Sequence, residues 1–121
     1  MTTLSLPADQ KEPLQLKPWN VQDVRQIDVQ FARQLDLTSD QLSAQAINPS
    51  DNLAIGDAVA VFSTPAGALS AASPAPDITV DSNKTLRFVV QAQEPGRARL
   101  EVSVNTANGQ SYNPVFEFDV V

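Results

Sequence analysis

The residue types that perform most enzyme chemistry are missing from this sequence. It contains no histidine and no cysteine, so neither a Ser–His–Asp nor a Cys–His arrangement can form, and His- or Cys-ligated zinc is excluded. Two carboxylate pairs remain, Asp36 with Asp40 and Asp51 with Asp57. A glycosidase needs such a pair across a sugar cleft, which a small β-rich domain rarely forms. We therefore predict that the protein is not an enzyme.

Oxygen-rich stretches are the remaining candidates for a metal site. Calcium takes six to eight oxygen ligands, and residues 36–40, 48–52 and 81–83 each offer several. None of them has the closely spaced Asp-x-Asp pattern of a dedicated calcium loop, and the same side chains are suited to Asx turns. The sequence predicts no cofactor, with calcium as the weaker alternative.

Trp19 and Tyr112 are the only large amphipathic aromatic residues. If both are exposed on one face, they could stack on sugar rings or contact a partner. The opposite interpretation is that Trp19, which follows Pro18, closes the edge of the core, and that Tyr112 is buried opposite Val104. The two residues are therefore the candidate contact site, and their exposure decides between the interpretations.

The charge balance excludes one large class of partner. The formal net charge is −6, and the eight basic residues form no long cluster, whereas nucleic-acid binding needs a concentrated basic face. No stretch approaches the ~20 apolar residues of a membrane-spanning helix, so we expect no membrane insertion. The N-terminus has no basic start followed by an apolar run. The chain is thus expected to be cytoplasmic or part of a virion if complete, and extracellular or at a cell surface if cut from a longer protein.

Alternation of apolar and polar residues with a period of two indicates β-strands. It is clearest in 97–104, where every even-numbered residue is apolar, and it recurs in 86–92 and 27–31. Weaker strands are expected at 13–17, 41–47, 58–62, 78–81 and 116–121. Short strands at this spacing are typical of a sandwich or barrel. We predict an all-β, immunoglobulin-like β-sandwich of about seven or eight antiparallel strands over residues 12–121, after a flexible lead over residues 1–11.

The last two strands are expected to form a hairpin of defined register. A two-residue turn would place Glu117 on the buried face. A three-residue loop that ends in a left-handed Gly109 shifts the register by one residue. Leu100 then faces Phe116, with opposite charges paired on the outer face. We predict this second register, with a bulge or an edge at Pro114, which cannot donate a hydrogen bond.

The segment from Pro65 to Pro76 consists mostly of small, uncharged residues. A loop of this length in a compact domain is uncommon and is sometimes functional. A surface loop without a role and a contact loop both remain open as interpretations.

The C-terminal third resembles a known kind of module. Residues 86–92, the turn Pro95-Gly96, then 98–109 and 115–121 are similar to the last three strands of bacterial immunoglobulin-like and cadherin-like β-sandwich modules, and 36–42 resembles the acidic turn before a middle strand of these modules. The resemblance implies a spacer, adhesion or binding module of bacterial or phage origin, and it transfers no site residue.

The function predicted from the sequence follows from this combination. We expect a non-enzymatic structural or protein-interaction module of a larger surface, secreted or virion assembly, whose partners are proteins or neighbouring domains. The alternative is a carbohydrate-binding accessory module that uses Trp19 and Tyr112 as exposed aromatics.

Overall fold

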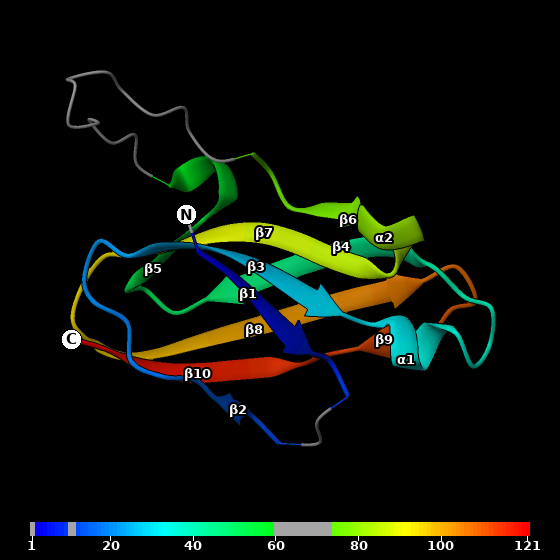
Figure 1. Ribbon diagram of the computed structural model, residues 1–121, viewed down its shortest axis with the longest axis horizontal. Coiled ribbons are helices and arrows are strands. Elements are labelled where there is room, and N and C mark those ends of the chain that lie inside the picture. The colour runs from blue at the N-terminus through cyan, green and yellow to red at the C-terminus, as the bar shows by residue number, and fades with distance from the viewer. Residues whose placement is uncertain (1, 10–11, 60–73) are drawn as a thin grey trace.

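The computed structural model describes residues 2–9, 12–59 and 74–121. They form an all-β molecule of two mixed sheets (Figure 1). The first sheet has the order β1-β3-β7-β5, with β6 also paired to β7, and the second has the order β2-β10-β8-β4, with β9 also paired to β8. The bounds of the first sheet are β1 Thr2–Pro7, β3 Val24–Gln30, β7 Thr85–Ala92, β5 Leu53–Ile55 and β6 Asp77–Thr79. Those of the second are β2 Leu14–Gln15, β10 Val115–Val120, β8 Gly96–Thr106, β4 Leu42–Pro49 and β9 Ser111–Tyr112.

Among the described residues, three very short helical segments interrupt the strands. They are α1 (Ala32–Leu35), the 3-10 turn η1 (Gly56–Ala58) and α2 (Val80–Asn83). In the part of the chain that the structure describes, no helix is long and apolar enough to cross a membrane.

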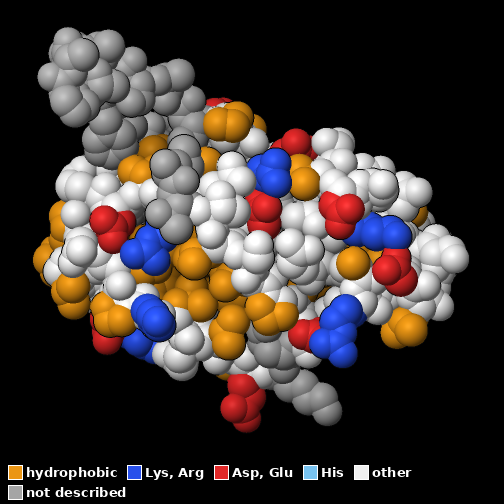
Figure 2. Space-filling view, viewed as in Figure 1, with side chains coloured by type: hydrophobic (Ala, Val, Ile, Leu, Met, Phe, Trp, Pro, Cys, Tyr) orange, Lys and Arg blue, Asp and Glu red, His pale blue; other side chains and the backbone are white. Residues whose placement is uncertain are grey.

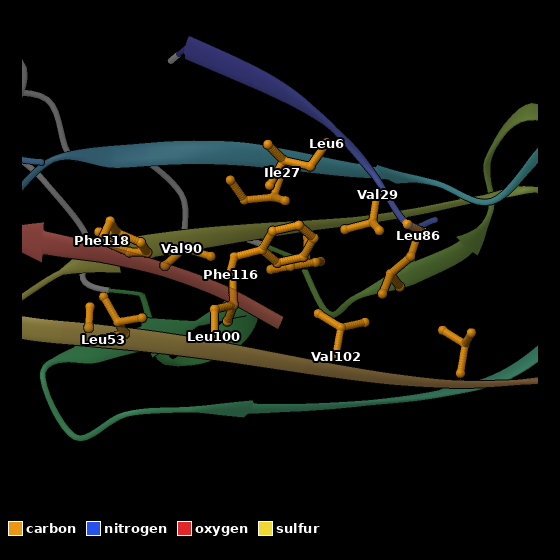
Figure 3. Close-up of a cluster of buried hydrophobic side chains, with 14 of the residues drawn as sticks. Leu6, Ile27, Val29, Leu53, Leu86, Val90, Leu100, Val102, Phe116 and Phe118 are labelled. Atoms are coloured by element: carbon orange, nitrogen blue, oxygen red, sulfur yellow. The ribbon is translucent and has the colours of Figure 1, made fainter. Parts of the chain in front are cut away.

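The core lies between the two sheets and is built from the alternating positions. Ile27 pairs with Phe88 across β3 and β7, and both side chains are buried. From the second sheet, Leu100 and Phe116 point toward the first sheet, where Figure 3 labels Ile27. Side chains on alternate positions of a strand share one face, so the pattern that predicted the strands also supplies the core.

The three firmest strand predictions are confirmed. Residues 97–104 lie within β8 and residues 86–92 within β7, and residues 27–30 of the predicted strand 27–31 lie within β3. The predicted hairpin register is also confirmed, because Leu100 lies opposite Phe116 and Arg99 opposite Glu117.

The hairpin loop has the predicted length and closing residue. Gly109 adopts a φ of 84°, and Thr106 N–H donates to the carbonyl of Gln110 at 2.9 Å, which leaves three residues in the loop. Pro114 lies in the break between β9 and β10 and uses its carbonyl to accept from Val102 N–H at 3.0 Å. Proline thus stands where its lack of an N–H does no harm.

Several predictions are corrected by the strand pairing. Residues 2–7 are not a flexible lead but the edge strand β1, which runs parallel to β3, and Leu6 is buried. The β2–β10 pair is parallel as well, so the expected purely antiparallel pairing is wrong at both of these edges. The predicted strand at 58–62 begins within η1, and residues 60–62 lie outside the described residues. Most of the segment from Pro65 to Pro76 lies outside them too.

Candidate functional site

Trp19 is not a surface platform. Its side chain is 0% exposed, and its ring stacks on Phe118 with 4.5 Å between ring centroids. The guanidinium carbon of Arg25 lies 4.6 Å from the centroid of the Trp19 ring, which adds a cation–π contact. The interpretation of Trp19 as a plug at the core edge is therefore confirmed, and its interpretation as a contact residue is wrong.

Tyr112 is separated from Trp19 and is partly buried. It pairs with Val104 as predicted, and its ring packs 6.2 Å from the ring of Phe31. Trp19 bridges to Val120 at the end of β10, whereas Tyr112 lies before β10 begins. The structure thus does not bring the two predicted site residues together.

The oxygen-rich stretches do not gather into a metal site in the described part of the chain. Within residues 2–9, 12–59 and 74–121 there is no group of three or more acidic side chains placed to hold an ion. Asp36 and Asp40 share one turn, but their carboxylates have different partners, described below.

Three loops gather at one end of the two sheets, and we call them together the loop end. They are 36–41 between α1 and β4, 80–84 between β6 and β7, and 107–110 between β8 and β9. In Figure 1 they lie on the right, beside α1, α2 and β9. The sequence separates the loops by about 25 to 70 residues, and the strand order alone brings them together.

The first and third loops are joined by hydrogen bonds to both main chain and side chain. The N–H of Asn108 donates to Asp40 Oδ1 at 2.9 Å, and Asn108 Nδ2 donates to the carbonyl of Thr38 at 3.3 Å. The N–H of Ala107 donates to the carbonyl of Gln41 at 2.8 Å. These contacts fix the hairpin loop against residues 38–41.

The first and second loops are joined by side chains. Lys84 Nζ forms an ion pair with Asp36 Oδ1, and Asn83 Nδ2 donates to Gln41 Oε1 at 3.1 Å. The carbonyl of Lys84 also accepts from Phe31 N–H at 3.0 Å, just before α1. The first loop is therefore held from both sides, and it forms the centre of the loop end.

Asp40 is the buried polar centre of this arrangement. Asp40 is only 2% exposed. Burial raises the pKa of Asp40, but the polar side chain of Thr106 and the hydrogen bonds from the N–H groups of Gln41 and Asn108 outweigh burial and lower the pKa below its ordinary value. The carboxylate therefore stays ionised and accepts hydrogen bonds from two loops.

Lys84 is held in its charged form. The hydrogen bond and the opposite charge of Asp36 raise the pKa of the Lys84 ammonium. A small polar hollow separates the first two loops and is lined by Asp36, Ser39, Asp40, Gln41, Ser82 and Lys84. A protonated lysine in an ion pair is a structural link and a poor base.

Leu37 stands at the apex of the first loop and is 85% exposed. The turn closes beneath it, because the carbonyl of the buried Leu35 accepts from Thr38 N–H at 3.3 Å and from Asp40 N–H at 3.0 Å. Ser39 completes the turn with a φ of 52°. The loop buries one leucine and presents the other to solvent.

The second loop has an unusual backbone. Asp81, Ser82 and Asn83 all have positive φ, at 53°, 56° and 65°. Residues other than glycine rarely adopt this region, and each such residue costs on the order of 1 kcal/mol. The rest of the fold holds three of them in succession, which gives the loop a fixed and strained shape.

The sequence predicts a different chemistry for this region. Residues 36–40 and 81–83 were candidates for calcium or for carboxylate catalysis because of their oxygens. The overlooked residue is Leu37, an apolar side chain flanked by polar ones in a turn. The sequence does not indicate that Leu37 is exposed, because a leucine in a segment between two strands can equally be buried, as Leu35 is.

The loop end offers contacts rather than reactive groups. Besides Leu37, the exposed residues of the three loops include the neutral polar Thr38, Ser82 and Asn108 and the acidic Asp81. On the face seen in Figure 2, acidic and basic side chains are interspersed and form no concentrated basic region. The arrangement is suited to binding a concave protein surface by shape and by an apolar centre.

Comparisons with known proteins identify the fold. No protein-family model matches this chain, and no curated protein matches it in sequence. The fold is similar to that of the cysteine protease inhibitor EhICP2 from Entamoeba histolytica, with a TM-score of 0.53 and 9% identity over 99% of this chain and 96% of that chain. Amebosin matches with a TM-score of 0.45 and 6% identity, covering 100% of this chain and 99% of its own. PbICP-C, solved in complex with falcipain-2, matches with a TM-score of 0.45 and 11% identity, covering 100% and 98%.

These findings correct the function predicted from the sequence. A solved structure that shares this fold, EhICP2, is a cysteine protease inhibitor, which contradicts the expected role as a structural module of a surface, secreted or virion assembly. The carbohydrate-binding alternative fails separately, because Trp19 is fully buried. At this level of similarity, the chain has the fold of EhICP2.

Proposed function

We propose that this protein is a non-enzymatic inhibitor of cysteine proteases and that the loop end is the surface that enters the protease cleft. One observation carries the proposal: a braced end of three loops stands on a fold shared with the inhibitor EhICP2 over 99% of the chain. The partner is accordingly a protein, and the mechanism is obstruction of the cleft by shape.

The bracing of the loops explains how such a surface inhibits. Binding costs less free energy when the contact residues are already fixed in the free protein. Here the central loop is tied to both of its neighbours, to Asn108 on one side and to Lys84 on the other. The loop end therefore loses little conformational entropy when it enters a cleft.

The same hydrogen bonds oppose cleavage of the loop. A peptide bond is cut when the chain lies extended across the protease cleft. The carbonyl of Leu35 holds the N–H groups of Thr38 and Asp40, so the turn around Leu37 stays closed. The loop can occupy the cleft without adopting the extended form of a substrate.

The immunoglobulin-like arrangement of the two sheets remains a prediction alongside this proposal. The confirmed hairpin register supports it for the last two strands. The resemblance of 86–121 to bacterial immunoglobulin-like and cadherin-like modules likewise remains a hypothesis about the fold and carries no function.

An inhibition assay tests the proposal directly. The purified protein is titrated into papain, with a fluorogenic peptide as substrate, and into trypsin as a serine-protease control. We expect reversible inhibition of papain with an inhibition constant below about 1 μM and none of trypsin. Absence of inhibition of papain and of a wider panel of cysteine proteases at about 100 times that concentration contradicts the proposal.

The absence of native cysteine allows the surface to be mapped. A single cysteine is introduced at Ser82 in the loop end, or at Asp51 in the turn between β4 and β5 at the other end, and is capped with a bulky polyethylene glycol maleimide. Both positions are exposed. We expect the Ser82→Cys adduct to lose inhibition and the Asp51→Cys adduct to retain it. The reverse result places the binding surface elsewhere.

A further inference from the structure

We infer that Leu37 is the specificity-determining contact of the loop end and that the target protease receives it in an apolar pocket beside its catalytic cysteine. The inference rests on the proposed function and names the kind of protease that the surface fits. A single exposed leucine means little by itself, so the inference depends on how this leucine is held and on what surrounds it.

The exposure of Leu37 is not explained by the packing of the fold. Among the described residues, the large apolar side chains that are exposed are Leu37, at 85%, and Val121, at 63%. Val121 lies at the opposite end of the sheets, where its main chain bonds to Trp19 and Val21. Leu37 is thus the one strongly exposed apolar side chain of the loop end.

The residues on both sides of Leu37 are held by the other two loops. Before it, the Asp36 carboxylate is paired with Lys84 from the second loop. After it, the Thr38 carbonyl accepts from Asn108 Nδ2 of the third loop at 3.3 Å. Binding costs less free energy when the segment that carries a contact residue is already ordered, and the residues on both sides of Leu37 are ordered in this way.

The surroundings of Leu37 define the pocket that would accept it. Exposed Thr38 and Ser39 follow Leu37 in the same loop, and the side chain of Asn108 bonds to the main chain of Thr38. The negative charge of Asp36 is matched by Lys84, and the second loop also exposes Asp81. An apolar centre within a polar rim is the usual anatomy of a strong contact. A pocket lined by an acidic group is unfavourable, because a leucine leaves that buried charge without a partner.

The test compares inhibition constants of wild type, Leu37→Ala, Leu37→Met and Leu37→Asp, with Val121→Ala as the matched control at the far end. The assay uses two cysteine proteases, chosen by their own peptide substrates: one prefers leucine and the other arginine in the specificity position. Because Leu37 is exposed, none of the variants should shift the melting temperature by more than about 2 °C.

With the leucine-preferring protease, we expect Leu37→Ala to raise the inhibition constant about 10- to 50-fold and Leu37→Asp to raise it more than about 100-fold. Leu37→Met should stay within about 3-fold, and Val121→Ala within about 2-fold. The loss should appear as faster dissociation. Wild type should inhibit the arginine-preferring protease at least about 10-fold more weakly.

The outcomes separate the two proposals. If wild type inhibits and Leu37→Ala inhibits equally well, the inference about Leu37 is wrong and the proposed function stands. If wild type inhibits the arginine-preferring protease better, the assigned pocket chemistry is wrong. If wild type inhibits no cysteine protease, the proposed function fails and the inference fails with it.

Discussion

Asp40 shows how one buried charge can order a surface. Its carboxylate accepts the N–H of Gln41 at 2.8 Å and the N–H of Asn108 at 2.9 Å. A buried carboxylate is tolerable only where hydrogen bonds replace its water, and here the replacing groups come from two different loops. The need to satisfy Asp40 therefore keeps these loops together.

The lowered pKa of Asp40 predicts a pH dependence of stability. A carboxyl whose pKa is lower in the folded than in the unfolded state stabilises the fold above its unfolded value of about 4, and this contribution is lost as the pH falls through the folded pKa. We expect Asp40→Asn to lower the melting temperature at pH 7, and the gap from wild type to narrow below about pH 4. Melting curves from pH 7 to pH 2.5 measure it, and a gap that is constant with pH contradicts the role of the charge.

The stacked pair of Trp19 and Phe118 predicts a large loss on truncation. Both side chains are 0% exposed, so Phe118→Ala should cost about 3–5 kcal/mol of unfolding free energy. Urea unfolding followed by Trp19 fluorescence measures the loss. Exposed Arg97→Ala, on the opposite face of the same hairpin, should cost less than about 1 kcal/mol. Similar losses for the two variants would mean that the core does not close over Trp19.

Among the elements, the second loop has the backbone conformation that least suits its residue types. Asp81, Ser82 and Asn83 all hold positive φ, and glycine adopts this region without the steric cost. We expect Ser82→Gly to raise the unfolding free energy by about 0.5–1 kcal/mol. Ser103→Gly in the middle of β8 should lower it by a similar amount. Chemical denaturation compares the two, and destabilisation by Ser82→Gly would contradict the strain described for this loop.

The elements that the sequence predicted well are those whose pattern is local. The hairpin of β8 and β10 could be assigned to the residue, because only one register places Leu100 against Phe116 while pairing Arg99 with Glu117. Strand β1 could not, since it offers only Leu4 and Leu6 as alternating apolar residues. Its partner β3 is parallel and distant in sequence, and nothing local indicates such a pairing.

At the scale of the whole molecule, β1 covers one edge of the first sheet. It pairs with β3 from Thr2 to Pro7, and it buries Leu6. Removing residues 1–7 should lower the melting temperature by about 10 °C or more and should expose the β3 edge to pairing with other molecules. Calorimetry and size-exclusion chromatography measure the two effects. An unchanged melting temperature would mean that these residues are a flexible lead that does not stabilise the fold.

The candidate site could not be predicted from the sequence, because it depends on the fold of the whole molecule. Its parts are Leu37, Ser82 and Asn108, which come from three loops that only the completed strand order brings together. Periodicity indicates which residues face the core, and it says nothing about which turns become neighbours. Residue type alone makes Trp19 and Tyr112 candidates for a contact site, but the packing of the fold places Trp19 in the core.

The C-terminal end of the described chain lies away from the loop end. Strand β10 finishes beside Gly96 at the start of β8, and Figure 1 shows the C-terminus on the left, opposite the three loops. The full length of β8, about 35 Å for a strand of this size, separates the C-terminus from the three loops. A biotin or resin tether attached at the C-terminus will therefore hold every molecule with its binding surface facing outward, and an immobilised form of this protein can serve to capture its target from solution.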